Sequence, residues 1–256
     1  MKRLIFRILS RGIMAVALLL ASCHSSYQVT RVEGGRISVD STWDAVPDAE
    51  AMALLAPYKK QIDSVMCRVI GTAEVSMDRF RPESPLSNLI ADVLREDAME
   101  VQGMPVDMGM INIGGIRSSL AEGAITIENI FEVLPFENSL CILSMKGNAM
   151  KLLFENIAAR GGEGVSGVKL EISKDGKVLR ALIGGKPIED DRTYTVATVD
   201  YLADGNDGMI AFMQADKREC PKGATVRGIF TKYVEKNSAV GKKITSHIEG
   251  RVIVKK

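Results

Sequence analysis

The fold of this chain can be worked out from the stretch Val106-Asp-Met-Gly-Met-Ile-Asn-Ile-Gly-Gly-Ile-Arg117. Residues 106–111 are predicted to form a short strand, and Asn112-Ile113-Gly114-Gly115 follows at the point where that strand ends. Two glycines allow backbone to approach a ligand closely, and the Arg117 guanidinium offers five donors in a planar fork. On spacing alone, a turn with a surface arginine is the simpler interpretation.

Patterns of helix and strand continue on both sides of this stretch. Upstream, Ser84-Pro85 is typical of a helix N-terminus, and the apolar residues of 86–94 share one helical face. A helix is also expected from Pro47 and a strand over 67–77. Downstream, we expect strands over 139–145, 168–173, 177–183, 193–199 and 243–254, and helices over 147–159, 224–235 and from a Thr126 cap to Val133. These elements predict one α+β domain over residues 46–256, with mixed sheets and packed helices.

Composition excludes several classes of function. The 256 residues are 46% hydrophobic and carry a formal charge of +1, so nucleic acid is not an expected partner. The chain has two histidines, His24 and His247, whereas a two-metal hydrolase centre needs several histidine and carboxylate ligands. We therefore expect no dinuclear metal centre and no cofactor in this chain. An all-carboxylate magnesium site remains an alternative, although no acidic cluster suggests one. A catalytic triad would have to use His247, which no GxSxG motif accompanies, and no phosphate-binding glycine motif occurs.

The first 22 residues have the pattern of a secretory signal peptide. Basic residues precede an apolar run over 13–21 that is too short to span a membrane. Leu20-Ala21-Ser22-Cys23 resembles a bacterial lipoprotein box, which predicts lipidation of Cys23; a plain signal peptide with an incidental cysteine is the alternative. Residues 23–45 are polar and are expected to form a tether. We expect an exported chain, lipid-anchored at the bacterial cell envelope on its periplasmic or surface face.

Three cysteines would remain after lipidation: Cys67, Cys141 and Cys220. At most one pair could form a disulfide in an oxidising compartment, and the spacing favours none. The spacing is not that of a zinc site either. The interpretation we adopt is three buried thiols.

Three further segments carry residue types that suit a binding site. Arg79-Phe80-Arg81 precedes the helix predicted from Ser84 and could face an anion. Leu134-Pro135-Phe136-Glu137-Asn138 places a ring and an amide after a short helix. Tyr201-Leu-Ala-Asp-Gly-Asn-Asp207-Gly208 is a tight loop with a ring at one end and a carboxylate at the other. Taken singly, each is explained equally well by a surface turn or a core aromatic residue.

Together, and in this order, the segments resemble the C-terminal, substrate-binding domain of the 5′-nucleotidase/UDP-sugar hydrolase family. The likeness covers roughly residues 65–236. The segments that carry it are Ser87–Asp92, Asn112–Arg117, Val133–Asn138, Gly185–Ile188, Tyr194–Thr198 and Tyr201–Gly208.

The resemblance implies that a nucleoside is clamped between two rings, a carboxylate binds its ribose and arginines bind its phosphate. The aromatic pair matches Phe136 and Tyr201, and the carboxylate matches Asp207. The other polar positions match two arginines, which are Arg117 and one of Arg79 or Arg81, and two amides, which are Asn112 near the reacting end and Asn138 near the base.

The chain departs from the family pattern at three points. Ile113 stands at the first glycine of the family's Asn-Gly-Gly-Gly motif, and Asn206 stands at the second glycine of its Gly-Gly-Asp-Gly loop. The largest departure is the family's N-terminal metallophosphatase half, with its two metals and catalytic histidine, for which this sequence has no ligands. The resemblance therefore implies a domain that orients a nucleotide but does not generate the attacking nucleophile.

Three functions are compatible with this pattern. The first is the binding half of a split 5′-nucleotidase, whose divalent metal pair belongs to a separate metallophosphatase chain. The second is a stand-alone nucleotide or nucleoside binder at the envelope, without a catalytic role. The third is a domain that uses the fold for protein contacts only. In each case the membrane is a partner only through the lipid anchor.

Overall fold

The computed structural model describes residues 28–255 of the chain. The predicted signal peptide over 1–22 and the lipidation site Cys23 lie outside the described residues. The chain divides into two compact units, residues 1–53 and 54–256, and each is described by itself. The domain boundary predicted at residue 46 stays a prediction.

The described part of the first unit contains little regular structure. Residues 28–39 form neither helix nor strand, and the 3₁₀ helix η1 (Ser41–Ala45) follows an Asp40 cap. The helix α2 (Ala49–Met66) begins in this unit and confirms the helix expected from Pro47. None of its residues is buried. Within residues 28–255, no helix has the length and apolar character needed to cross a membrane.

The second unit is built on three sheets within the described residues. A five-stranded sheet has the strand order β10-β4-β9-β2-β5, in which β2 and β9 run parallel and the other neighbours run antiparallel. A four-stranded sheet has the order β11-β6-β7-β8, and β1 pairs with β3. The strands are β1 (Val69–Ala73), β2 (Met108–Ile111), β3 (Gly123–Thr126), β4 (Leu140–Lys146), β5 (Gly164–Ser166), β6 (Val168–Ser173), β7 (Val178–Ile183), β8 (Lys186–Pro187), β9 (Thr193–Val199), β10 (Lys217–Glu219) and β11 (Val252–Lys255).

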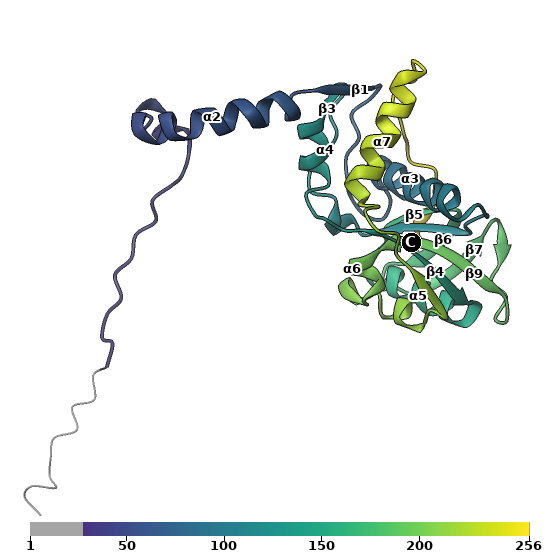
Figure 1. The fold of residues 1–256 in the computed structure, drawn as a ribbon. Coiled ribbons are helices and arrows are strands. Elements are labelled where there is room, and N and C mark those ends of the chain that lie inside the picture. Colours follow the sequence, from purple (N-terminus) through teal and green to yellow (C-terminus); the bar gives the residue numbers. More distant parts are fainter. Residues whose placement is uncertain (1–27, 256) are drawn as a thin grey trace, which may run out of the picture. The chain divides into compact units, whose positions relative to one another are not determined.

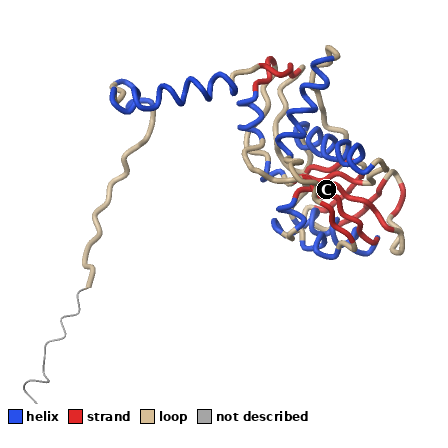
Figure 2. Tube along the Cα trace, viewed as in Figure 1, coloured by secondary structure: helices blue, strands red, loops and turns tan. Residues whose placement is uncertain are grey.

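Two long helices cover this strand framework. The helix α3 (Pro85–Gln102) packs against β2, β5 and β9, and α5 (Gly147–Ala159) packs against β4, β6, β7 and β9. Figure 1 shows α3 and α5 on opposite sides of the strands, and Figure 2 shows the same layers by type of element. The other helices that lie wholly within this unit are α4 (Ile127–Val133), α6 (Asp200–Ala203) and α7 (Val226–Ala239). This arrangement confirms the predicted α+β class with mixed sheets.

Local signals in the sequence fix several helix ends. Ser84 caps α3 through its side chain, Pro85 stands at the first helical position, and Gly103 ends the helix in the left-handed conformation. Thr126 caps α4 in the same way, with Asn129 returning the bond. The predicted apolar face of α3 is buried in the core. These predictions are confirmed because each depends on neighbours in sequence.

The last predicted strand, over 243–254, is wrong in its first part. Regular pairing is confined to β11, and Ile244 makes only an isolated bridge with Ala73. The buried carboxylate of Glu83 accepts the backbone N–H groups of Glu249, Arg251 and Val252 at 2.7, 2.8 and 3.3 Å. A side chain therefore takes donors that a strand would use in its ladder.

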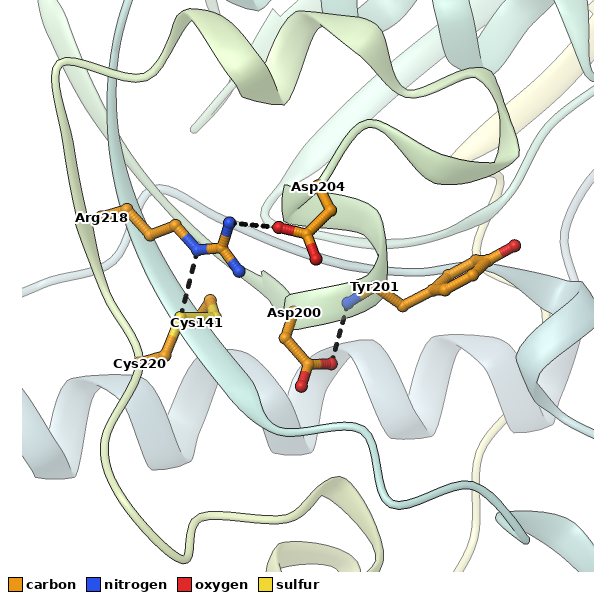
Figure 3. Close-up of a disulfide and its surroundings, with 6 residues drawn as sticks. All are labelled: Cys141, Asp200, Tyr201, Asp204, Arg218 and Cys220. Atoms are coloured by element: carbon orange, nitrogen blue, oxygen red, sulfur yellow. Dashed lines mark hydrogen bonds and ion pairs between the residues drawn. A yellow bond between two sulfur atoms is a disulfide. The ribbon is translucent and has the colours of Figure 1, made fainter.

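The expectation of three buried thiols is also wrong. Cys141 and Cys220 form a disulfide (Figure 3). Among the described residues Cys67 is the free cysteine, and it is exposed. The pairing of β10 with β4 places Glu219 opposite Ile142, and so brings Cys220 beside Cys141. The sequence did not predict β10, so nothing in the spacing indicated this pair.

Replacing both bonded cysteines (Cys141→Ser with Cys220→Ser) is expected to lower the free energy of unfolding by about 2–4 kcal/mol. The reason is that the bond closes a loop between residues 79 apart and so restricts the unfolded chain. Urea unfolding measures the difference. Cys67→Ser is the matched control and is expected to change stability by less than about 0.5 kcal/mol. Equal stability of the double variant and the parent would contradict a stabilising bond.

Candidate functional site

A cavity of about 370 Å³ lies where four segments of the second unit meet. The segments are the turn after β2, the loop after α4, the C-terminal end of α5 and the chain from α6 to the 3₁₀ helix η3 (Asn206–Gly208). Six of the eight residues predicted to bind substrate line it. The complete lining is Asn112, Gly114, Gly115, Arg117, Phe136, Asn138, Arg160, Tyr201 and Asp207.

The turn after β2 supplies one wall of the cavity. Asn112 precedes the 3₁₀ helix η2 (Ile113–Gly115), and a Cβ on Gly115 would lie 2.7 Å from the Asn112 Oδ1 atom. A side chain at position 115 would therefore displace the Asn112 amide. The side chain of Ile113 is buried and does not line the cavity, so this departure from the family motif leaves the wall open. The Oδ1 atom of Asn112 is buried without a hydrogen-bond partner in the described part of the chain.

Two aromatic rings and an arginine lie along the cavity. Phe136 is 47% exposed and Tyr201 is 40% exposed, which is unusual for rings of this size in a domain with a large core. The backbone N–H of Arg117 donates to the carbonyl of Val133 at 2.9 Å, which ties the turn after β2 to the end of α4. The Arg117 guanidinium carbon then lies 5.9 Å from the centre of the Phe136 ring. These rings offer flat apolar faces to a ligand.

Asp207 is the most strongly constrained residue of the cavity. It has φ 54° and is the one non-glycine residue of 28–255 with positive φ, a conformation that costs energy and persists where surrounding contacts enforce it. Its Oδ2 accepts from Asn112 Nδ2 at 2.7 Å and lies 3.3 Å from Arg160 Nη2, while its Oδ1 accepts from the Tyr201 hydroxyl at 3.2 Å. Asp207 is thus held toward the cavity by residues of three segments.

The disulfide supports the Tyr201 side of the cavity. Arg218 of β10 donates to Cys220 Sγ at 3.3 Å and to Asp204 Oδ1 at 2.6 Å (Figure 3). Asp204 follows α6, the short helix that carries Tyr201. The Cys141–Cys220 disulfide therefore holds β10 beside β4. Through Arg218, β10 in turn holds Asp204 at the end of α6.

Sequence reasoning missed two residues, Arg160 and Glu163. Both flank Gly161-Gly162, the glycine pair that follows the helix predicted over 147–159. Glu163 is fully buried and accepts from Arg160 Nε at 2.7 Å, Arg81 Nη2 at 2.5 Å and the Ile113 N–H at 2.6 Å. The hydrogen bond from Arg160 to Glu163 is the main cause of the raised pKa of Arg160. The signal that could have found the pair is two charged residues placed at a glycine turn.

The structure does not bring Arg79 or Arg81 to the cavity wall. The Arg81 guanidinium is bound to Glu163 and, through Nε, to the carbonyl of Gly162 at 2.9 Å. Arg79 is half-buried, and of its groups only the backbone N–H has a described partner, Asp78 Oδ1 at 2.6 Å. Arg81 therefore lies behind the cavity as support, and Arg160 lies at its wall.

The donor set does not fit a dinuclear metal centre. Over residues 28–255, no group of three or more His, Cys, Asp or Glu side chains is placed to hold a metal ion. The side chain of His247 is 79% exposed, and its backbone carbonyl accepts from Asn88 Nδ2 at 3.0 Å.

Comparison with known proteins identifies the fold. Residues 69–214 match the model of the family described as 5′-nucleotidase, C-terminal domain. The chain belongs to the 5′-nucleotidase family. The crystal structure of a 5′-nucleotidase precursor from Thermus thermophilus is similar with a TM-score of 0.70 and 28% identity, covering 82% of this chain and 44% of that one.

Curated relatives of the 5′-nucleotidase C-terminal domain are much longer than this chain. The trifunctional nucleotide phosphoesterase protein YfkN of Bacillus subtilis is 30% identical over 223 residues, which are 79% of this chain and 15% of that protein. Protein UshA of Yersinia enterocolitica is 30% identical over 189 residues, which are 71% of this chain and 34% of that protein. The chain thus spans about a third or less of these two relatives.

The phenol of Tyr201 is expected to report on Asp207. The pKa of Tyr201 is raised, mainly by the negative charge of Asp207. Burial and the hydrogen bond between Tyr201 and Asp207 raise it further. Because a carboxylate disfavours a neighbouring phenolate, Asp207→Asn is expected to bring this pKa back toward its ordinary value of 10.0. Tyrosinate absorbance followed against pH measures the shift, and Tyr201→Phe identifies the transition. Identical titrations of the parent and Asp207→Asn would contradict the contact.

Proposed function

We propose that this chain is the nucleotide- or nucleoside-binding half of a split 5′-nucleotidase, which orients the nucleotide for hydrolysis by a separate metallophosphatase chain. One observation carries the proposal. Phe136, Tyr201, Asp207 and Arg117 share one cavity, while residues 28–255 hold no metal-ligand set.

The cavity chemistry suits a nucleotide. A base stacked on the rings of Phe136 and Tyr201 would gain about 1–3 kcal/mol for each stacking contact. Asp207 can accept hydrogen bonds from ribose hydroxyls, and the Arg117 fork can meet two phosphate oxygens at once. Asn138 lies on the same wall and offers an amide to the edge of the base. Each group addresses a different part of the ligand.

Positioning is the contribution this half would make to hydrolysis. Holding the phosphate in one orientation removes much of the entropic barrier of a bimolecular step. The divalent metal pair and the nucleophile would be supplied by the partner chain. The cavity residues hold the nucleotide and perform no bond-breaking step themselves.

An envelope location is part of the same proposal. The lipoprotein box at Cys23 would tether the domain to a membrane surface, and lipid contributes about 0.8 kcal/mol for each buried CH₂. A cell wall protein of Listeria monocytogenes is among the relatives, with 29% identity over 84% of this chain and 30% of that protein. The Cys141–Cys220 bond is the kind that persists in oxidising compartments.

Stacking on Phe136 gives the first test. Phe136→Ala is expected to weaken AMP and adenosine alike by about fivefold to a hundredfold, because one face of the base loses its ring. Calorimetric titration of the purified protein measures both affinities. Phe80→Ala removes an exposed ring that does not line the cavity, and is expected to change neither. Unchanged affinity in Phe136→Ala would favour a domain that uses the fold for protein contacts.

Reconstitution separates a split enzyme from a stand-alone binder. The chain alone is expected to bind AMP without releasing phosphate, with or without manganese. Mixing it with a separate exported metallophosphatase chain is expected to yield phosphate release that Phe136→Ala reduces. Binding without release in any mixture would favour the stand-alone binder, and metal-dependent release by the chain alone would overturn the argument from its donor set.

A further inference from the structure

Two guanidinium groups line the cavity, although the family resemblance accounts for only one of them. Arg117 comes from the turn after β2, and Arg160 comes from the C-terminal end of α5. The other arginine that the resemblance implied, Arg79 or Arg81, does not line the cavity. Arg160 therefore occupies a place in the site that no motif assigned to it.

The position of Arg160 is fixed by its surroundings. It follows the last turn of α5, where Gly161 and Gly162 have φ 75° and 105°. A Cβ on Gly162 would lie 2.3 Å from the carbonyl oxygen of Pro82, so the turn is pressed against the segment that carries Arg81. Arg160 Nε then donates to the buried Glu163 at 2.7 Å. The direction of the guanidinium plane follows from this bond.

Part of the Arg160 guanidinium remains available to a ligand. Nε is used by Glu163, and Nη2 lies 3.3 Å from Asp207. Within residues 28–255, Nη1 of Arg160 and both Nε and Nη2 of Arg117 have no hydrogen-bond acceptor, while Arg117 Nη1 donates to the carbonyl of Gly114 at 3.3 Å. The cavity thus presents unused donors of two arginines.

The charges of the cavity favour an anion. Its lining holds two guanidinium groups and one carboxylate, Asp207. The charge of Glu163 is already shared by Arg81 and Arg160 behind the wall. A ligand that carries a phosphate would complement this excess of positive charge, whereas an uncharged nucleoside would not.

We propose that Arg160 is a phosphate-binding residue of this cavity and that Glu163 is its positioning residue. The inference rests on the proposed function, because it takes a nucleotide as the ligand. Arg160 then supplies the guanidinium that the sequence assigned to Arg79 or Arg81, and makes the site select nucleoside monophosphates over nucleosides.

Paired titrations test this assignment on the full chain. Arg160→Gln is expected to weaken AMP binding by about tenfold to a hundredfold, because charge-assisted hydrogen bonds to the phosphate are lost. Its affinity for adenosine is expected to change by less than about threefold, which also reports that the cavity is folded. Arg180→Gln removes an exposed arginine of β7 outside the cavity, and is expected to leave both affinities unchanged.

Two conservative variants separate direct contact from long-range charge. Arg160→Lys keeps the charge but loses the fork that reaches Glu163, Asp207 and a ligand together, so AMP affinity is expected to stay at least about fivefold below the parent. Glu163→Gln keeps Arg160 but weakens the hydrogen bond that orients its guanidinium. This variant is expected to lower AMP affinity less than Arg160→Gln does. In both, AMP affinity is expected to fall by a larger factor than adenosine affinity does.

Each contrary result has a distinct meaning. An equal loss of AMP and adenosine binding in Arg160→Gln would overturn the phosphate assignment and leave a structural role. Full recovery in Arg160→Lys would overturn direct recognition by the fork. A parent protein that binds neither ligand would overturn the proposed function itself, and the inference with it.

Discussion

The candidate site depends on one buried carboxylate, that of Glu163. A charge taken out of water destabilises the fold unless its hydrogen-bonding capacity is filled, and Glu163 is fully buried. It is satisfied by a guanidinium before α3, a second at the end of α5 and a backbone N–H after β2. Segments from three parts of the chain must therefore meet at one point. Two of the three, the turn after β2 and the end of α5, are walls of the cavity.

The hydrogen bonds of Glu163 also restrict the positions of the residues that face the cavity. Glu163 orients Arg160, Arg160 lies beside Asp207, and Asp207 accepts from Asn112 and Tyr201. Asp207 is held at positive φ, which costs of order 1–3 kcal/mol when a non-glycine residue adopts a strained backbone. Gly205 and Gly208, both at positive φ, let the backbone turn on either side of it. A site that is ordered before its ligand arrives loses less entropy on binding.

Features that depend on near neighbours could be predicted from the sequence, and features made by distant segments could not. The helix over 147–159 and the strand over 193–199 have the predicted bounds, because hydrophobic periodicity is a local feature of the sequence. The residues that the family motifs mark, such as Phe136 and Asp207, do meet in one cavity. In contrast, the disulfide needs β10 to pair with β4, and the bond of Arg81 to Glu163 joins residues 82 positions apart. Spacing carries no information about such contacts. Spacing therefore left the cysteines unpaired, and the resemblance assigned the second phosphate-binding arginine to Arg79 or Arg81.

The presence of Arg160, and of neither Arg79 nor Arg81, in the cavity lining bears on whether the cavity is functional or a remnant of the fold. Exposed rings at Phe136 and Tyr201 and positive φ at Asp207 each make the isolated domain less stable than a buried ring or a relaxed loop would. None of these features is needed by the sheets, whose core is filled by residues such as Phe154, Phe212 and Phe230. Protein contacts alone do not explain why the two exposed rings and the positive φ of Asp207 lie around one cavity. They also do not explain why two guanidinium groups line that cavity, while Arg81 is bound to Glu163 behind it. The simplest physical explanation is that the cavity is arranged for a ligand with a flat ring, vicinal hydroxyls and an anionic group.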